Sequence, residues 1–256
     1  MSEEDTSGQV DFGFRRVPAA EKAPLVRAIF DSVAERYDVM NDLMSAGIHR
    51  WWKSELIALL KPRPGQRLLD VAGGTGDIAL RALPRLVHGG TTEGGVVVCD
   101  VSEAMLAIGR ARALDQGILT GIEWLCADAE RLPVCDRSVD FYTIGFGLRN
   151  VTPIDAALAE ARRVLKPGGR FLSLEFTPEI SPGLQPLYNL YSFGFVPLLG
   201  QIVTGDRDAY TYLVESIRRF PRQSELAEML VRAGFDRVQF RNLTGGVAAL
   251  HSAWRL

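Results

Sequence analysis

Apolar residues recur through the middle of the chain in short runs, and amphipathic stretches separate those runs. Five runs are rich enough in β-branched and aromatic residues to predict strands: 67–72, 96–101, 122–127, 139–146 and 170–176. The helical patterns between them cover 77–87, 102–116 and 153–165. Strands that alternate with helices form a mostly parallel sheet with helices on both faces. We therefore predict an α/β fold whose ligands bind beyond the carboxyl ends of the strands.

The two ends of the chain follow other patterns. Residues 1–19 are largely polar, and we expect a flexible tail without the layout of a signal peptide. Residues 20–60 look helical, with a break near 41–47. At the other end a helix over 224–232 precedes two extended runs, 236–243 and 247–255, which must pair antiparallel because the turn between them is short. A parallel sheet that ends in such a hairpin is the layout of the Rossmann-like methyltransferases.

One long segment carries no charge. From Ile180 to Gly205 there is no Asp, Glu, Lys or Arg, and apolar residues are dense. Three prolines and several amides in the segment argue against a straight helix exposed to lipid. We expect an apolar lid or an interfacial surface, with a buried connecting segment as the alternative.

The strongest local signal is a glycine loop where a strand meets a helix, LDVAGGTGD from Leu69 to Asp77. Glycines allow a sharp turn and a close approach of backbone to ligand. The loop also fits the dinucleotide pattern G-x-G-x-x-G/A. Asp77 would repel a pyrophosphate at the helix start, whereas S-adenosylmethionine (SAM) carries a sulfonium and an ammonium. We expect Asp70 to be a second acid near the mouth of the same site, so we favour SAM over a dinucleotide.

Two further acids follow the next strands. Asp100 ends the second strand, where a carboxylate accepts hydrogen bonds from ribose hydroxyls in both SAM and NAD enzymes. Asp128 and Ala129 follow the third strand, where an adenine amino group could be read; alternatively, Asp128 caps the following turn.

Charge and cysteine content exclude several classes of protein. The 29 basic and 31 acidic residues give a net charge of −2, so we expect no nucleic-acid partner. Cys99, Cys126 and Cys135 form no C-x-x-C pair and are interpreted as reduced thiols of a cytoplasmic protein. No histidines stand at metal-ligand spacing, so we predict no metal.

Four motifs resemble the UbiE/MenG family of ubiquinone and menaquinone biosynthesis C-methyltransferases over about residues 20–256. The most specific is YDVMNDLMSAGIHRWW at Tyr37–Trp52. The others are FGLRN at Phe146–Asn150, RVLKPGGRFLSLEFT at Arg163–Thr177, where the family usually ends in serine, and NLTGGVAALH at Asn242–His251.

The resemblance implies transfer of a methyl group from SAM to a ring carbon of a prenylated quinol, and it leaves open whether the ring is a benzoquinol or a naphthoquinol. The residues expected to hold SAM are Asp70, Gly73, Gly74, Thr75, Gly76, Asp100, Asp128 and Ala129. Two positions depart from the family. Asp128 stands where many relatives have asparagine, and Gly145 stands where a serine often contacts SAM.

Ring-carbon methylation also needs groups that stabilise a phenolate and accept protons. A guanidinium is a poor base, so we assign Arg149 to stabilising phenolate oxygen, with Asn150 as its orienting partner. The alternative is that Arg149 pairs with an acid on a neighbouring loop. Tyr37, Asp38 and His49 are candidates for the general base, and each could instead be structural.

We expect one methyltransferase domain over 20–256: a helical cap (20–60), a SAM-binding core (61–177), an apolar substrate or lid insertion (178–222), and a C-terminal helix and hairpin (223–256). The apolar insertion predicts peripheral contact with the inner face of the membrane or with a biosynthetic assembly. Two other functions remain open: an NAD-dependent oxidoreductase using the same loop, and a non-catalytic scaffold that binds prenyl quinol.

Overall fold

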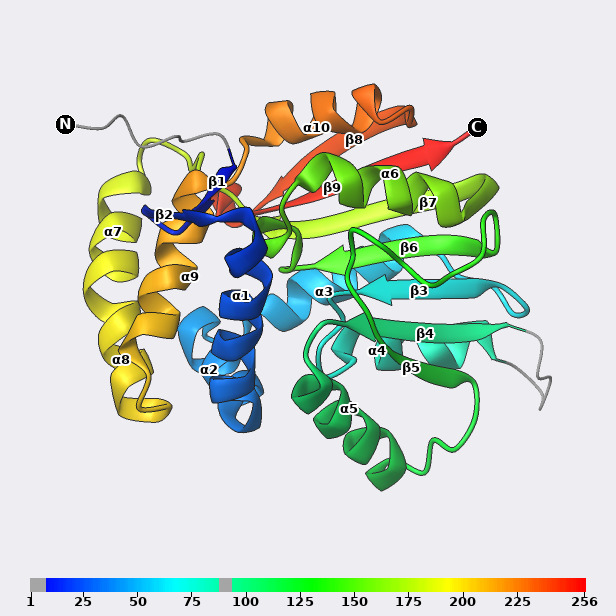
Figure 1. Ribbon diagram of the computed structural model, residues 1–256, viewed down its shortest axis with the longest axis horizontal. Helices are drawn as coiled ribbons and strands as arrows, with labels where there is room; N and C mark the ends of the chain where they lie inside the picture. Colours follow the sequence, from blue (N-terminus) through cyan, green and yellow to red (C-terminus); the bar gives the residue numbers. More distant parts are fainter. Residues whose placement is uncertain (1–7, 88–93) are drawn as a thin grey trace.

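A seven-stranded sheet in the order β5-β4-β3-β6-β7-β9-β8 forms the centre of the protein (Figure 1). The computed structural model describes residues 8–87 and 94–256. The strands of this sheet are β3 (Arg67–Val71), β4 (Gly95–Asp100), β5 (Ile122–Cys126), β6 (Val139–Gly145), β7 (Leu165–Phe176), β8 (Asp236–Leu243) and β9 (Ala248–Arg255). The first five pair in parallel, and β9 pairs antiparallel with both β7 and β8. The predicted sheet with its antiparallel hairpin is confirmed.

Helices cover both faces of the sheet. The helices packed on the sheet are α3 (Ile48–Leu60), α4 (Asp77–Leu86), α5 (Glu103–Asp115), α6 (Ile154–Val164) and α10 (Gln223–Arg232). Because side chains alternate along a strand, Leu68 packs with α3, α4 and α5, while its neighbour Leu69 packs with α6 and α10. The amphipathic stretches between the predicted strands thus become the two outer layers.

A helical lobe faces the carboxyl ends of the parallel strands (Figure 1). It consists of α1 (Ala19–Val33), α2 (Tyr37–Ser45), α7 (Gln185–Leu190), α8 (Val196–Val203) and α9 (Arg207–Arg219), with short 3-10 and π turns at Ala34–Arg36 and Tyr191–Phe195. Its own core includes Val33 and Met40 from the first part of the chain and Val196, Tyr210 and Val214 from the apolar insertion. The lobe therefore joins two segments about 150 residues apart in sequence.

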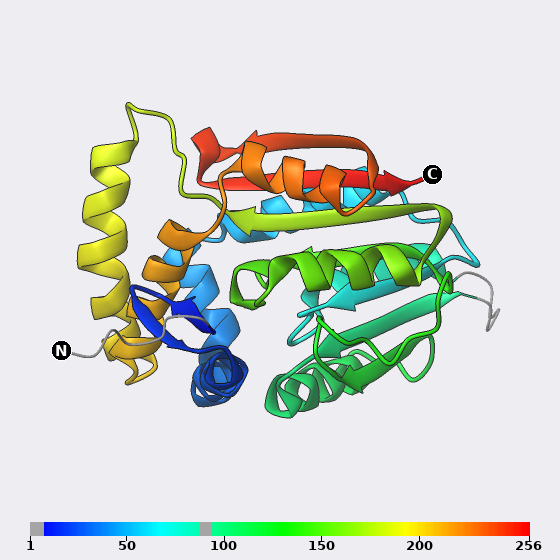
Figure 2. The same ribbon diagram turned by 45° about the horizontal axis from the view of Figure 1, so that its top comes forward.

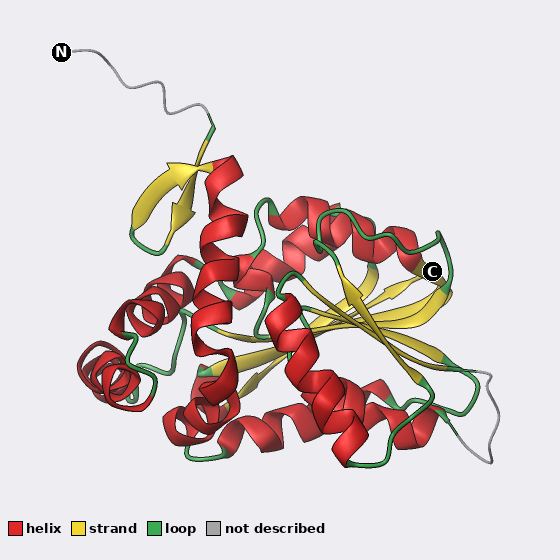
Figure 3. Ribbon diagram, turned by 60° about the horizontal axis from the view of Figure 1, so that its bottom comes forward, coloured by secondary structure: helices red, strands yellow, loops and turns green. Residues whose placement is uncertain are grey.

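The prediction of a flexible tail over residues 1–19 is wrong for the second half of that range. Strands β1 (Gln9–Phe12) and β2 (Arg15–Pro18) form an antiparallel hairpin that stands apart from the main sheet (Figure 3). Phe12 is buried and stacks on Tyr212 of α9, with 4.3 Å between ring centroids. The hairpin is held by this distant contact, which its polar composition does not reveal. The part of the tail at residues 1–7 lies outside the described residues.

Candidate active site

Two cavities adjoin each other between the carboxyl ends of the strands and the helical lobe. The first, the cofactor cavity, has about 990 Å³ of open space and is bordered by the glycine loop, the ends of β3, β4 and β6, and α1. The second, the apolar cavity, has about 1310 Å³ and is bordered by α1, α2, α3 and α9. Phe30, Tyr37 and Phe146 line both cavities and mark the place where the two cavities meet.

The glycine loop lets the backbone border the cofactor cavity. Gly74 has φ +52°, which favours glycine, and an added Cβ would lie 3.1 Å from Met105. A Cβ on Gly73 would lie 2.9 Å from a backbone oxygen. Gly76, also predicted to hold the cofactor, does not line the cavity; its Cβ position is 2.8 Å from Trp124, so it is needed for packing.

Asp100 is fixed at the floor of the cofactor cavity. Its Oδ2 accepts the amide of Gly74 at 2.8 Å, and its Oδ1 accepts the amide of Ser102 at 2.9 Å. Burial raises the pKa of this carboxyl, and these amides oppose the rise. A carboxylate has about four lone-pair sites, so two backbone donors leave acceptor capacity on a residue that lines the cavity.

Three further predicted contacts also lie at this cavity. Thr75, Asp128 and Ala129 line it, and Asp128 Oδ1 accepts the amide of Glu130 at 2.9 Å. Asp128 is thus both a turn cap and a wall of the cavity. Gly145 lines it as well, and a Cβ there would lie 2.5 Å from Ile78 Cδ1.

Asp70 does not stand at the mouth of the cavity as expected. It is fully buried beneath the loop because β3 is an interior strand of the sheet and is covered on both faces. Its Oδ1 accepts the hydroxyl of Thr143 at 2.7 Å, and burial raises its pKa to about 7. Asp70 therefore supports the loop from below.

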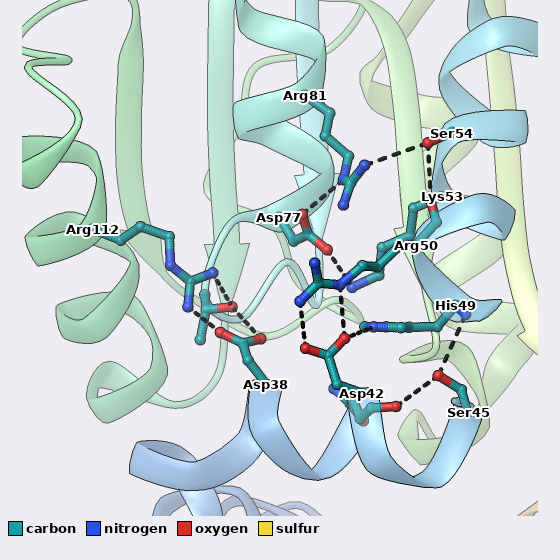
Figure 4. Close-up of polar contacts among 12 residues, drawn as sticks. Asp38, Asp42, Ser45, His49, Arg50, Lys53, Ser54, Asp77, Arg81 and Arg112 are labelled. Atoms are coloured by element: carbon teal, nitrogen blue, oxygen red, sulfur yellow. Dashed lines mark hydrogen bonds and ion pairs between the residues drawn. The ribbon is translucent and has the colours of Figure 1, made fainter. Parts of the chain in front are cut away.

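The acid at the start of α4 is neutralised by the helical cap (Figure 4). Asp77 lies 2.8 Å from Lys53 of α3 and 2.7 Å from Arg81 of its own helix. Burial alone would favour the neutral acid, but these two cations lower its pKa to about 2. The negative charge of Asp77, which the sequence analysis assigned to the cofactor, is therefore largely neutralised by cations of the protein itself.

Asp38 also ties the cap to the cofactor loop. Its carboxylate forms an ion pair with Arg112 of α5 and accepts the hydroxyl of Thr75 at 3.3 Å (Figure 4). Asp38 lines neither of the two cavities. Of the three base candidates, Asp38 therefore has a structural position, whereas Tyr37 and His49 line the apolar cavity.

Arg149 lines the apolar cavity and is already paired. Its Nη1 lies 2.8 Å from Oε1 of Glu175 on β7, and both side chains are almost fully buried. Burial raises the pKa of Glu175, and Arg149 opposes the rise. Arg149 therefore does pair with an acid, as the alternative proposed, but that acid lies on a strand and not on a neighbouring loop. Asn150 lines the cofactor cavity and accepts the hydroxyl of Tyr212 at 3.1 Å, so it does not orient Arg149 directly.

His49 is buried in the first turn of α3. Its Nε2 lies 2.8 Å from Asp42 Oδ1, and Arg50 Nε donates to the same oxygen at 2.7 Å (Figure 4). Burial, with Lys53 nearby, lowers the pKa of His49 to about 4. The histidine is therefore neutral at pH 7.

Sequence reasoning missed several of these partners. Lys53 follows His49 by four residues on the cap helix, and this spacing could have placed both on one face. Glu175 lies within the third quoted motif. No local pattern pairs Asp38 with Arg112, because they are 74 residues apart.

The uncharged segment divides between inside and outside. Tyr188, Tyr191 and Val196 line the apolar cavity, whereas Phe193 is half exposed. No helix within residues 8–87 and 94–256 is long and apolar enough to cross a bilayer. In the same residues no three His, Cys, Asp or Glu side chains cluster as a metal ion requires.

Comparison with known proteins agrees with this geometry. A model of the ubiE/COQ5 methyltransferase family matches residues 16–255. The chain is 54% identical over 253 residues to the ubiquinone/menaquinone biosynthesis C-methyltransferase UbiE of Dinoroseobacter shibae, covering 99% of both chains. It is 56% identical over 253 residues to UbiE of Acidiphilium cryptum, covering 98% of this chain and 99% of that one.

A solved SAM-dependent methyltransferase of Thermotoga maritima, described as a possible histamine N-methyltransferase, has the same fold. The TM-score is 0.61 at 20% identity, over 90% of this chain and 100% of that one. The fold and the family resemblance predicted from the sequence are confirmed, and the chain belongs to the ubiE/COQ5 methyltransferase family.

Proposed function

We propose that this protein transfers a methyl group from SAM to a ring carbon of a prenylated quinol, a demethylated benzoquinol or demethylmenaquinol. The observation that carries the proposal is that the two cavities adjoin and share three lining residues, Phe30, Tyr37 and Phe146. Methyl transfer requires donor and acceptor in contact and in line, and adjoining cavities provide this. The names of the relatives, ubiquinone/menaquinone biosynthesis C-methyltransferases, support the substrate class.

The cofactor cavity fits SAM by its chemistry. Gly73 and Gly74 line it at positions where a Cβ would crowd neighbouring protein atoms, and Asp100 offers a carboxylate to ribose hydroxyls. Thr75, Asp128 and Ala129 complete the predicted contacts. When bound, SAM supplies an electrophilic methyl group, and the ring carbon that receives it gives up one proton.

The apolar cavity fits the ring and the first part of a prenyl tail. Its lining is mostly aliphatic and aromatic, with Trp52, Phe176 and Val196 among the members. Burial of apolar chain contributes about 0.8 kcal/mol per CH₂, so one five-carbon isoprene unit adds roughly 3–4 kcal/mol. The substrate must be reduced, because quinol oxygens donate electron density to the ring whereas a quinone is a poor nucleophile.

Arg149 is placed to act on a quinol oxygen from its buried pair with Glu175. A guanidinium has five donors, and one acid occupies only some of them. Through the remaining donors Arg149 stabilises negative charge on the oxygen as the ring attacks. Asn150 and Tyr212 hold the adjacent segment in place.

We also propose that the outer face of the lobe rests on the inner surface of the membrane, from the cytoplasmic side. The exposed apolar residues of this outer face are Leu190, Phe193, Phe195, Leu198 and Ile202. They belong to α7, α8 and the turn between them, at the outer side of the lobe (Figure 2). Tyr188 and Val196 of the same segment line the apolar cavity, so a prenyl tail could pass from lipid to the site. A biosynthetic assembly on this face is the alternative that a vesicle-binding test separates.

The function is tested by incubating the purified protein with methyl-labelled SAM and short-tailed demethylated quinols. We expect label in the extracted quinol. Binding of SAM without label in either ring would reject the substrate class, or favour the scaffold. Binding of NADH in place of SAM would favour the oxidoreductase.

A further inference from the structure

Methylation of a ring carbon releases one proton, and the apolar cavity offers few groups that can accept it. Its titratable lining residues, within the described part of the chain, are Tyr37, Tyr188, Tyr191, Tyr210, Tyr212, Arg149 and His49. A tyrosine is a neutral donor near pH 7, and a guanidinium stays charged. The described lining contains no carboxylate. Only His49 can accept a proton there near neutral pH.

The surroundings of His49 fix which ring nitrogen is free. The turn at Ala46–Gly47 folds α3 back on α2, which brings Asp42 to 2.8 Å from Nε2. Arg50 holds the same carboxylate and lowers the pKa of Asp42, so the carboxylate is ionised and can only accept. Nε2 therefore carries the hydrogen, and Nδ1 keeps its lone pair.

His49 also stands between the apolar cavity and solvent. A polar groove of about 840 Å³ lies outside the cap, and His49 lines it together with Asp42, Arg50, Asp77 and Arg81. A proton received from the cavity side can leave through the imidazole to water in this groove. The dyad resembles the arrangement in which a carboxylate orients a histidine base.

We propose that His49 is the general base of the methyl transfer, with Asp42 as its positioning residue. This inference rests on the proposed function. The new carbon–carbon bond forms as the carbon–sulfur bond breaks, the sulfonium becomes a neutral thioether, and the proton on the methylated ring carbon passes to Nδ1 while its electron pair returns to the ring. The histidinium then releases one proton to water in the polar groove.

The charged groups that face His49 are consistent with this role. They are Asp42 from α2, Arg50 and Lys53 from α3, and Asp77 from α4. Their net effect, together with burial, keeps the imidazole neutral above pH 5. A weakly basic imidazole suffices, because a ring carbon that holds both the new methyl group and its hydrogen is strongly acidic.

The test compares His49→Gln and His49→Ala with the wild-type protein. Loss of a general base lowers kcat by about 10²–10⁴-fold, and we expect the Kd for SAM to stay within about threefold. Added imidazole restores turnover to His49→Ala, and more basic imidazoles restore more. Asp42→Asn lowers kcat with little change in KM. Glu55→Gln on the same helix, which removes an ion pair with Arg241, is the matched control.

A spectroscopic measurement does not depend on activity. The chain has three histidines, so ¹⁵N spectra of labelled wild-type protein can be assigned. We expect His49 to be neutral with hydrogen on Nε2, and this preference to weaken in Asp42→Asn. Hydrogen on Nδ1 in the wild type, a folded His49→Gln with kcat within about threefold, or failure of imidazole to rescue a folded His49→Ala would overturn the proposal. Absence of methyl transfer by the wild-type protein would instead reject the proposed function.

Discussion

Lys53 Nζ lies 2.8 Å from Asp77 Oδ2 and joins the helical cap to the helix that follows the glycine loop. Lys53 is buried, and it approaches the carboxylate opposite Arg81. The same interface contains the pair of Asp38 and Arg112. The cap is thus fixed to the cofactor-binding loop by charges on both sides.

Replacing Lys53 by methionine keeps the apolar stem and removes the charge. Because Arg81 remains next to Asp77, we expect a loss of about 1–2 kcal/mol of unfolding free energy, below that of a fully orphaned buried charge. The Kd for SAM should rise about tenfold as the cap loosens. Urea denaturation and SAM titration measure the two effects. Arg81→Met is the control, and equal effects of both variants would contradict the role given to Lys53.

The pair of Arg149 and Glu175 predicts a separation of stability from activity. Glu175→Gln leaves a buried guanidinium without its anion, and we expect a loss of about 3–5 kcal/mol. The double variant Arg149→Met with Glu175→Leu should recover most of that stability but should not methylate quinol. Chemical denaturation and label transfer measure both. A double variant that is as unstable as Glu175→Gln would show that the pair is not the source of the loss.

Asp70 predicts a specific pH dependence. Its folded-state pKa of about 7 lies above the value of about 4 in an unfolded chain, so the folded state binds more protons between these values. The contribution of Asp70 to stability is therefore present below pH 4 and is lost as the pH rises toward 7. The unfolding free energy of Asp70→Asn minus that of the wild type should therefore increase by a few kcal/mol as the pH rises from 5 to 8. The same difference between the two proteins at both pH values would exclude this explanation.

Asp100 and Asp128 should differ in their effect on SAM affinity. A hydrogen bond to a charged acceptor contributes about 1.5–3 kcal/mol, so Asp100→Asn should raise the Kd by about 10–100-fold. Asp128→Asn keeps an acceptor and introduces the residue that many relatives carry, so a change below about threefold is expected. Calorimetric titration of both variants is the measurement. The reverse ranking would remove Asp100 from the cofactor site.

The two sides of the uncharged segment predict different defects. Val196→Phe fills the apolar cavity and should raise KM for long-tailed quinol more than for short-tailed quinol. The double variant Phe193→Asp with Ile202→Asp changes the outer face and should weaken binding to lipid vesicles. Its turnover of a short-tailed substrate in detergent should stay unchanged. Unchanged vesicle binding in the second variant would favour a protein partner on this face.

Local patterns predicted the sheet and its helices well because the apolar runs that form β3, β4, β6 and β7 are also mostly buried segments. The predicted helix over 77–87 is α4 to within one residue. The hairpin at 9–18 depends on Tyr212, and the pairing of Arg149 depends on Glu175, so neither follows from spacing. The structure also differs from two interpretations of the sequence. Asp70 lies buried beneath the loop and not at the cavity, and Asp77 forms an ion pair with Lys53 of the cap.

In the proposed function, a reduced ring in the apolar cavity receives the methyl group on carbon at the place where the two cavities meet, beside Phe30, Tyr37 and Phe146. The most direct measurement gives the purified protein methyl-labelled SAM and each demethylated substrate, reduced and oxidised, and locates the label by NMR. We predict a carbon-bound methyl group on the reduced ring and none on the oxidised ring. Label on a quinol oxygen, or equal labelling of the quinone, would contradict this account.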